Sequence, residues 1–158
     1  MKQDSLKTGS SSVGLLGFLL LAGLGCSSPE EPPELAMVMG GLQRFAEKLG
    51  YAIEAENRPL SDFYLHEVTE TIEAIQSIET YDGVVIAQPS RVIMPLLLER
   101  LRKELSEGDW ALAWGAYEDF IDGCNRCHAA TEHEFLEILP SSGQAPYSQR
   151  FRLENAQD

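Results

Sequence analysis

One short run near the C-terminal end of this 158-residue chain, Cys124-Asn125-Arg126-Cys127-His128, holds residue types that can do chemistry together. The spacing Cys-x-x-Cys-His is typical of a site where haem is attached covalently. Two cysteines three residues apart lie on one side of a helix, so both sulfurs can reach one porphyrin edge and form thioethers. The histidine that follows is placed to bind the iron on one axial face. The motif therefore predicts one covalent haem c, held by Cys124, Cys127 and His128.

Two other chemistries use a Cys-x-x-Cys pair. A thioredoxin-type redox pair follows a strand in a βαβ unit, whereas the residues before Cys124 have a helical pattern. A closed zinc site needs four ligands, but the other histidines are His66 and His133, and the chain has no second cysteine pair. Haem attachment is the favoured interpretation.

The N-terminal segment indicates export. Lys2 and Lys7 precede an apolar run at 13–24, which is typical of a signal peptide and is shorter than the roughly 20 residues of a membrane span. The sequence Leu-Ala-Gly-Leu-Gly-Cys at 21–26 resembles the lipobox of bacterial lipoproteins, with Gly23 where Leu is usual. This resemblance implies removal of residues 1–25, a diacylated Cys26 and an exported, periplasm-facing membrane lipoprotein. A plain signal peptide would instead leave the protein periplasmic.

Charge narrows the choice of partners. After residue 25 the chain keeps 133 residues, enough for one domain, with 10 basic and 24 acidic side chains and a net charge of −14. Such a surface repels nucleic acid and does not bind anionic lipid by charge. The acidic surface favours basic partner proteins, because long-range attraction accelerates their encounter. The alternative interpretation is that the acidic residues only keep the protein soluble. Lipid on Cys26 and haem on the other two cysteines leave none for a disulfide.

The remaining pattern predicts helices. Residues 26–34 are rich in Pro and acid and are expected to form a linker. Apolar residues at helical spacing predict helices at about 35–55, 60–78, 90–105 and 110–138, with Ser90 and Asp109 as caps. Pro95 is expected to kink the third helix or to mark its first turn. Residues 79–88 read as a loop, and no strand is expected. We therefore predict an all-α fold, an antiparallel four-helix bundle over 35–140 with a tail at 141–158.

The position of the motif on the expected fourth helix can be compared with the apolar face of that helix. At about 100° per residue, one face carries Trp110, Trp114, Tyr117, Ile121, Cys124 and His128. The haem ligand is thus expected to point into the core, with the covalent haem near one end of the bundle.

This arrangement resembles the group of cytochrome c-prime and its low-spin relatives. The resemblance spans about 35–138 and includes Gly108-Asp109-Trp110 and Tyr117-Glu118 besides the haem motif. It implies that His128 is the proximal ligand, that the distal side of the haem faces the first helix, and that the protein forms a homodimer through its first two helices. The tail at 140–151 is longer than is usual there; it would either fold back over the haem edge or be disordered.

The resemblance also makes the distal residue decisive. A Met there gives a six-coordinate iron suited to electron transfer, whereas an apolar residue leaves the iron open to small gases. Met39 lies on the apolar stripe of the first helix and is the candidate distal ligand; Met37 lies off that stripe, and Met94 is a weaker candidate. His66 is expected to be exposed, and His133 to be a solvated residue of the fourth helix.

Two functions follow from these expectations. The first is an electron carrier that cycles between Fe(III) and Fe(II), anchored to the membrane by lipid and meeting redox partner proteins of basic charge. The alternative is a five-coordinate protein that binds nitric oxide or carbon monoxide. An enzyme is not expected, because a peroxidase needs an acid–base group near the iron and none is predicted on a core face.

Overall fold

The computed structural model describes residues 34–153. It contains four helices, α1 (Leu35–Glu54), α2 (Arg58–Gln76), α3 (Ala87–Glu107) and α4 (Trp110–Ala130), and two short strands, β1 (Thr80–Tyr81) and β2 (Val84–Val85). The predicted all-α fold with four helices is confirmed. The predictions for the signal peptide, Cys26 and most of the linker lie outside the described residues.

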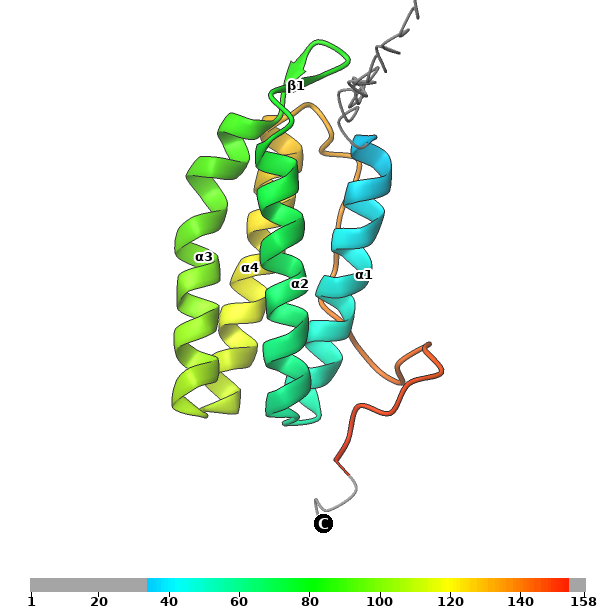
Figure 1. Cartoon of the computed structure of the whole chain (residues 1–158), viewed down its shortest axis with the longest axis vertical. Coiled ribbons are helices and arrows are strands. Elements are labelled where there is room, and N and C mark those ends of the chain that lie inside the picture. The colour runs from blue at the N-terminus through cyan, green and yellow to red at the C-terminus, as the bar shows by residue number, and fades with distance from the viewer. Residues whose placement is uncertain (1–33, 154–158) are drawn as a thin grey trace, which may run out of the picture. The chain divides into compact units, whose positions relative to one another are not determined.

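The four helices lie side by side, and consecutive helices run in opposite directions (Figure 1). Each helix packs on the next along the chain, and α4 returns to pack on α1. The apolar stripes meet in one core, whose largest fully buried side chains include Leu49, Ile53, Ile72, Leu101, Tyr117 and Phe120. None of the helices in 34–153 is long and apolar enough to cross a membrane. The beginning of α1 and the end of α4 lie at the same end of the helices (Figure 1).

The helix starts show which caps the chain uses. The Oδ1 atom of Asp109 accepts the Leu112 N–H at 3.0 Å, which confirms Asp109 as the cap of α4. The α3 helix begins three residues before Ser90, so the prediction that Ser90 caps it is wrong; Ser90 is buried inside the helix. Pro89 in the first turn explains the difference, because a first-turn residue needs no N–H. Pro95 lies inside α3, not in its first turn.

The connection between α2 and α3 is a small hairpin where a loop is predicted. Thr80 pairs with Val85 and Tyr81 with Val84. Asp82 and Gly83 between them have φ values of 49° and 84°, as a type I′ turn requires. The expectation of no strand is therefore wrong, because strands of two residues are too short to show an alternating pattern. The hairpin lies at the end of the molecule where α4 ends (Figure 1).

The α4 helix ends at Ala130, eight residues earlier than predicted. Glu132 takes a left-handed backbone conformation with φ of 62°, and the His133 N–H donates to the His128 carbonyl at 2.8 Å. This is the closing hydrogen bond of a Schellman motif, which usually has glycine at the left-handed position. With Glu there instead, the sequence carries little sign of the stop. Residues 131–139 are therefore free to fold back against α4.

The tail packs on the helices as far as residue 153. Ser141 is buried; its Oγ donates to the Glu47 carbonyl at 2.7 Å and lies 2.9 Å from the Tyr117 hydroxyl. Farther on, the Asn57 side chain donates to the Phe151 carbonyl at 2.6 Å. The tail thus runs along α1 to the opposite end of the helices (Figure 1). In its described part the tail therefore packs along the helices, while its relation to a haem edge stays a prediction.

Candidate functional site

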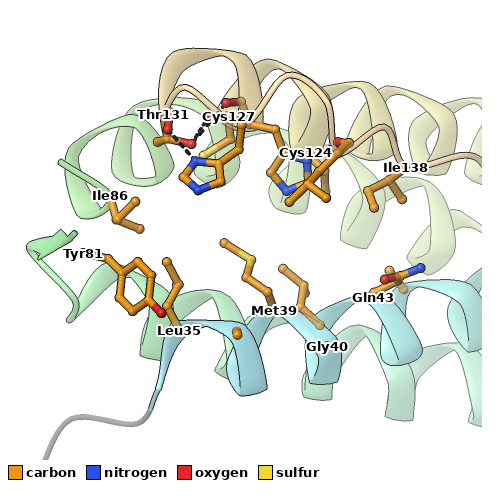
Figure 2. A pocket seen from close by; sticks show the side chains of 16 residues that line it. Leu35, Met39, Gly40, Gln43, Tyr81, Ile86, Cys124, Cys127, Thr131 and Ile138 are labelled. Atoms are coloured by element: carbon orange, nitrogen blue, oxygen red, sulfur yellow. Dashed lines mark hydrogen bonds between the residues drawn. The ribbon is translucent and has the colours of Figure 1, made fainter. Parts of the chain in front are cut away.

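A cavity of about 370 Å³ lies between the first turns of α1 and the last turns of α4. This volume is within the range of about 300–1,000 Å³ that is usual for ligand pockets. The α1 wall is mostly apolar and includes Leu35, Met39, Leu42 and Ala46. Tyr81 and Ile86, from the hairpin and the start of α3, close one side (Figure 2). The facing wall carries Cys124, Cys127 and His128 from α4, followed by Thr131, His133, Leu136 and Ile138.

The structure brings the main sequence-predicted site residues to this one cavity. Cys124, Cys127 and His128 line it from α4, and Met39 points into it from α1 toward the cysteines (Figure 2). The two other methionines considered are elsewhere: Met37 is 75% exposed, and Met94 is buried in the core at 4% exposure without lining the cavity. Among the methionines that the structure describes, Met39 is therefore the one that lines the cavity with the haem motif.

The two cysteines are buried free thiols. Burial, with a smaller contribution from Cys127, raises the pKa of Cys124 to about 12, and burial also raises the pKa of Cys127. Both groups therefore stay protonated at neutral pH. Cysteines that exchange disulfides have lowered pKa values and partial exposure, and these two lie within a helix with no strand leading into the motif. The site lacks the features of a thioredoxin-type pair.

The imidazole of His128 is held by the segment that follows α4. Its Nδ1 atom lies 2.7 Å from the Leu136 carbonyl oxygen. A carbonyl only accepts, so Nδ1 carries a proton and donates; in the neutral imidazole this leaves the lone pair on Nε2. Metal-binding histidines are oriented in this way, with the second ring nitrogen donating to a carbonyl or carboxylate. The sequence does not point to Leu136, because its pattern predicts that the helix continues through residues 131–138, whereas α4 ends at Ala130.

A second imidazole reaches the cavity. His133 lies beyond the end of α4, is half-buried and lines the cavity, with Nδ1 hydrogen-bonded to the Thr131 carbonyl. The prediction that His133 is a solvated helix residue is therefore wrong, because the helix has already ended. The cavity thus contains an acid–base side chain that the sequence did not place there.

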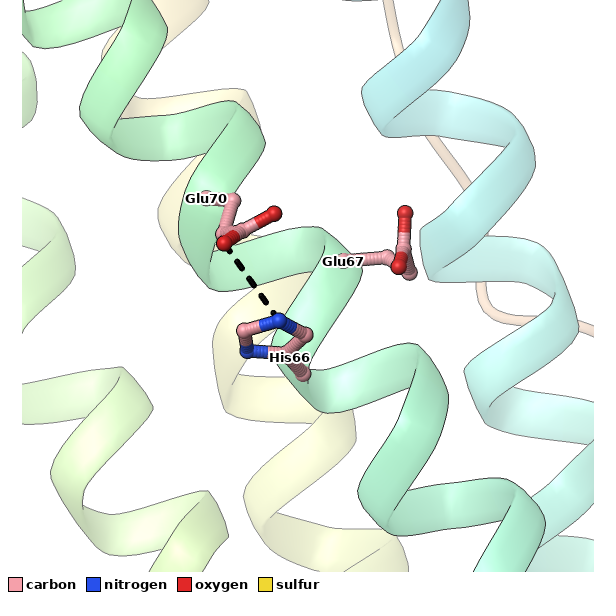
Figure 3. Close-up of side chains that lie close together, drawn as sticks. All are labelled: His66, Glu67 and Glu70. Carbon is pink, nitrogen blue, oxygen red and sulfur yellow. Dashed lines mark ion pairs between the residues drawn. The ribbon is translucent and has the colours of Figure 1, made fainter.

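Clustered metal ligands occur elsewhere. Among the described residues, one set of three ligand-type side chains, His66, Glu67 and Glu70, has ligand atoms within 4.8 Å of one another (Figure 3). His66 Nε2 lies 3.3 Å from Glu70 Oε1, and both side chains are almost two-thirds exposed, as predicted for His66. This is an ordinary surface pair at i,i+4 spacing. Among the residues that the structure describes, the thiols and imidazoles around the cavity do not form such a set.

The exposed side of the segment that follows α4 is both apolar and acidic. Phe135 and Leu139, on the segment after α4, are 75% and 68% exposed. Glu132, Glu134 and Glu137 on the same segment are exposed too. Residues 131–139 contain no Lys or Arg. The segment therefore presents large apolar side chains among carboxylates.

Comparison of the chain with models of protein families, with curated proteins and with solved structures finds no match. The candidate function therefore depends on the residues and the geometry of the cavity.

Proposed function

We propose that this protein is an exported haem c protein with a four-helix-bundle domain like that of the cytochrome c-prime group, and that it carries electrons. The single observation behind this proposal is that Cys124, Cys127 and His128 line the same apolar cavity that Met39 enters from the opposite wall. When bound, haem c supplies a one-electron Fe(III)/Fe(II) couple.

The residues present fit such a group. Two neutral thiols on one side of α4 are suited to thioether formation, and His128 Nε2 has a free lone pair for the iron. The Leu136 carbonyl orients the ring and raises its basicity through Nδ1. The apolar walls would keep water from a bound haem, and the thioether of Met39 would be available to hold the iron from the α1 side. Axial ligands and burial are the means by which a protein sets the reduction potential.

A gas-binding protein is the second candidate. Apart from Met39, the α1 wall consists largely of apolar groups such as Leu35, Gly40, Leu42 and Ala46. If the Met39 sulfur does not bind iron, this wall leaves an open distal side that suits nitric oxide or carbon monoxide.

The partner we propose is a redox protein with a basic surface. Carboxylates around exposed Phe135 and Leu139 match a partner with basic and apolar groups, since complementary charge speeds encounter and aromatic contacts are common at the centre of interfaces. Lipid on Cys26 would hold the protein at a periplasm-facing membrane. A homodimer through the first two helices remains part of the proposal.

The first experiment is to express the full chain in bacteria that make c-type cytochromes. We expect haem to stay on the denatured polypeptide and to resist acid-acetone extraction. Cys127→Ala should leave haem incompletely attached, whereas Cys26→Ser, the matched cysteine control, should keep it. A chain that gains no haem while a known c-type cytochrome matures in the same cells would contradict the proposal.

Visible spectra with and without carbon monoxide then separate the two functions. Sharp reduced bands that carbon monoxide hardly changes indicate the electron carrier, whereas broad high-spin bands that sharpen with carbon monoxide indicate the gas-binding protein. Because His133 lines the cavity, peroxide consumption is measured on the same samples; turnover at enzymatic rates would contradict a pure carrier.

A further inference from the structure

The haem motif contains a residue whose contacts have no part in attachment itself. Asn125, between the two cysteines, donates from Nδ2 to the Ile138 carbonyl at 2.8 Å, and its Oδ1 accepts the Ile138 N–H at 2.8 Å. One side-chain amide thus satisfies both backbone groups of a single residue thirteen positions away. Such a two-point contact fixes the distance and the orientation of that backbone against α4.

We infer that Asn125 is a positioning residue for His128: it holds residues 131–138 so that the Leu136 carbonyl meets His128 Nδ1. The inference rests on the proposed function, since it concerns the histidine that would bind the iron.

The segment is closed at both ends. At its start, the His133 N–H donates to the His128 carbonyl at 2.8 Å, and the Leu136 N–H donates to the His133 carbonyl at 2.9 Å. At its end, Asn125 holds Ile138, two residues after the carbonyl that His128 uses. With both ends fixed, the Leu136 carbonyl has little freedom to leave the imidazole.

Side-chain packing supports the segment mainly at its ends, where Thr131 is buried and Ile138 packs against the core. Phe135 is 75% exposed, Leu136 47% and Leu139 68%. Segments with few buried apolar contacts open locally at low free-energy cost. The Thr131 hydroxyl donates to the Cys127 and His128 carbonyls, and these bonds do not reach the imidazole ring. Ser141, beyond the segment, is held by Tyr117 and Glu47. The Asn125 contact is therefore the anchor nearest to the acceptor, because it ties Ile138 to the turn of α4 that carries His128.

Loss of that anchor has a defined consequence at the iron. A hydrogen bond from Nδ1–H makes the imidazole a stronger electron-pair donor to a bound iron. Stronger electron donation favours Fe(III) and therefore lowers the reduction potential of the haem. In Asn125→Ala the segment opens more often, so the bond weakens and the potential rises.

The test uses the full chain, carrying haem as expressed, in three forms: wild type, Asn125→Ala and Gln149→Ala. Gln149 is the matched control, because its amide also holds the C-terminal part of the chain, accepting the Tyr64 hydroxyl at 2.7 Å, but at a different place. For Asn125→Ala we expect attached haem as in wild type, a higher potential by spectroelectrochemistry, and at least tenfold faster hydrogen exchange in peptides covering 131–139. Gln149→Ala should change neither the potential nor that exchange.

Each other outcome decides against the inference in a recognisable way. Faster exchange with an unchanged potential would mean that Asn125 anchors the segment without positioning His128. Unchanged exchange would mean that it is not the anchor. If the wild type carries no haem, the proposed function fails first and the iron-directed role falls with it, whereas the exchange data still report on the anchor.

Discussion

Substituting Met39 separates the two candidate functions most directly. Met39→Leu replaces the thioether by a side chain of similar volume, and Met94→Leu makes the same change elsewhere in the core. Such swaps usually cost less than about 1.5 kcal/mol. Met94 is almost fully buried, whereas Met39 is half-buried at the cavity. We therefore expect Met94→Leu to destabilise the fold at least as much as Met39→Leu.

The two variants should rank in the opposite order for their effect on the spin state and the reduction potential of the iron. An axial Met raises the reduction potential of a haem. For a one-electron couple, a tenfold preference for the ferrous form corresponds to about 59 mV, so a thioether that prefers ferrous iron about 50-fold raises the potential by about 100 mV. Met39→Leu should lose this amount and become high-spin and reactive with carbon monoxide, while Met94→Leu keeps the wild-type spectrum.

The assay combines oxidised and reduced spectra, a redox titration and a thermal melt of each variant. A Met39→Leu protein that stays low-spin, with its potential unchanged, would show that Met39 is not the ligand. Loss of the low-spin spectrum in Met94→Leu with an unchanged melting temperature would show that our assignment of the facing methionine is wrong. A wild type that is already high-spin would favour the gas-binding function.

Three further predictions concern the lipid on Cys26, the close packing at Gly50 and the loss of stability at alkaline pH. Cys26→Ser should move the protein from the membrane to the soluble fraction; retention in washed membranes would argue against lipidation. Gly50→Ala adds a Cβ that would lie 2.5 Å from Ser141 Oγ and 2.6 Å from Tyr117 Cζ. The variant should be less stable, because overpacking costs about 1–3 kcal/mol, more than the gain of about 1 kcal/mol in helix propensity. An unchanged midpoint of urea unfolding would refute this. Burial and the hydrogen bond to a carboxylate raise the pKa of Tyr147 from 10.0 to about 12, so the folded state keeps a proton that the unfolded chain loses. Stability should therefore fall between pH 10 and pH 12, and less steeply in Tyr147→Phe.

The features that the sequence predicts correctly are local ones. The apolar stripe of α1 and the cap at Asp109 depend on neighbours within one or two turns, so spacing and residue type are enough. The same is true of the placement of Cys124, Cys127 and His128, which fall on one side of α4 because of helical geometry alone. Even Met39 follows from its place on a stripe, since the stripe must face the core.

The features that the sequence does not predict depend on contacts between distant segments. Tyr81 lines the cavity from β1 of a hairpin whose strands of two residues leave no pattern in the sequence. Leu136 lines it only because the chain folds back after α4. The tail gives no apolar periodicity, yet Ser141 and Phe151 are buried against helices that precede them by many residues. Hydrogen bonds such as that from Asn57 to Phe151 leave no pattern in either partner's own neighbourhood.

The early end of α4 matters more than an error of eight residues in a boundary. Had the helix continued to residue 138, Leu136 would lie about 12 Å along its axis from His128, beyond the reach of Nδ1. The left-handed conformation of Glu132 costs roughly 1–2 kcal/mol for a residue other than glycine. What that conformation provides is a chain reversal that brings a backbone carbonyl to 2.7 Å from the histidine. A single unfavourable residue conformation therefore connects the end of the helix with the orientation of the proposed iron ligand.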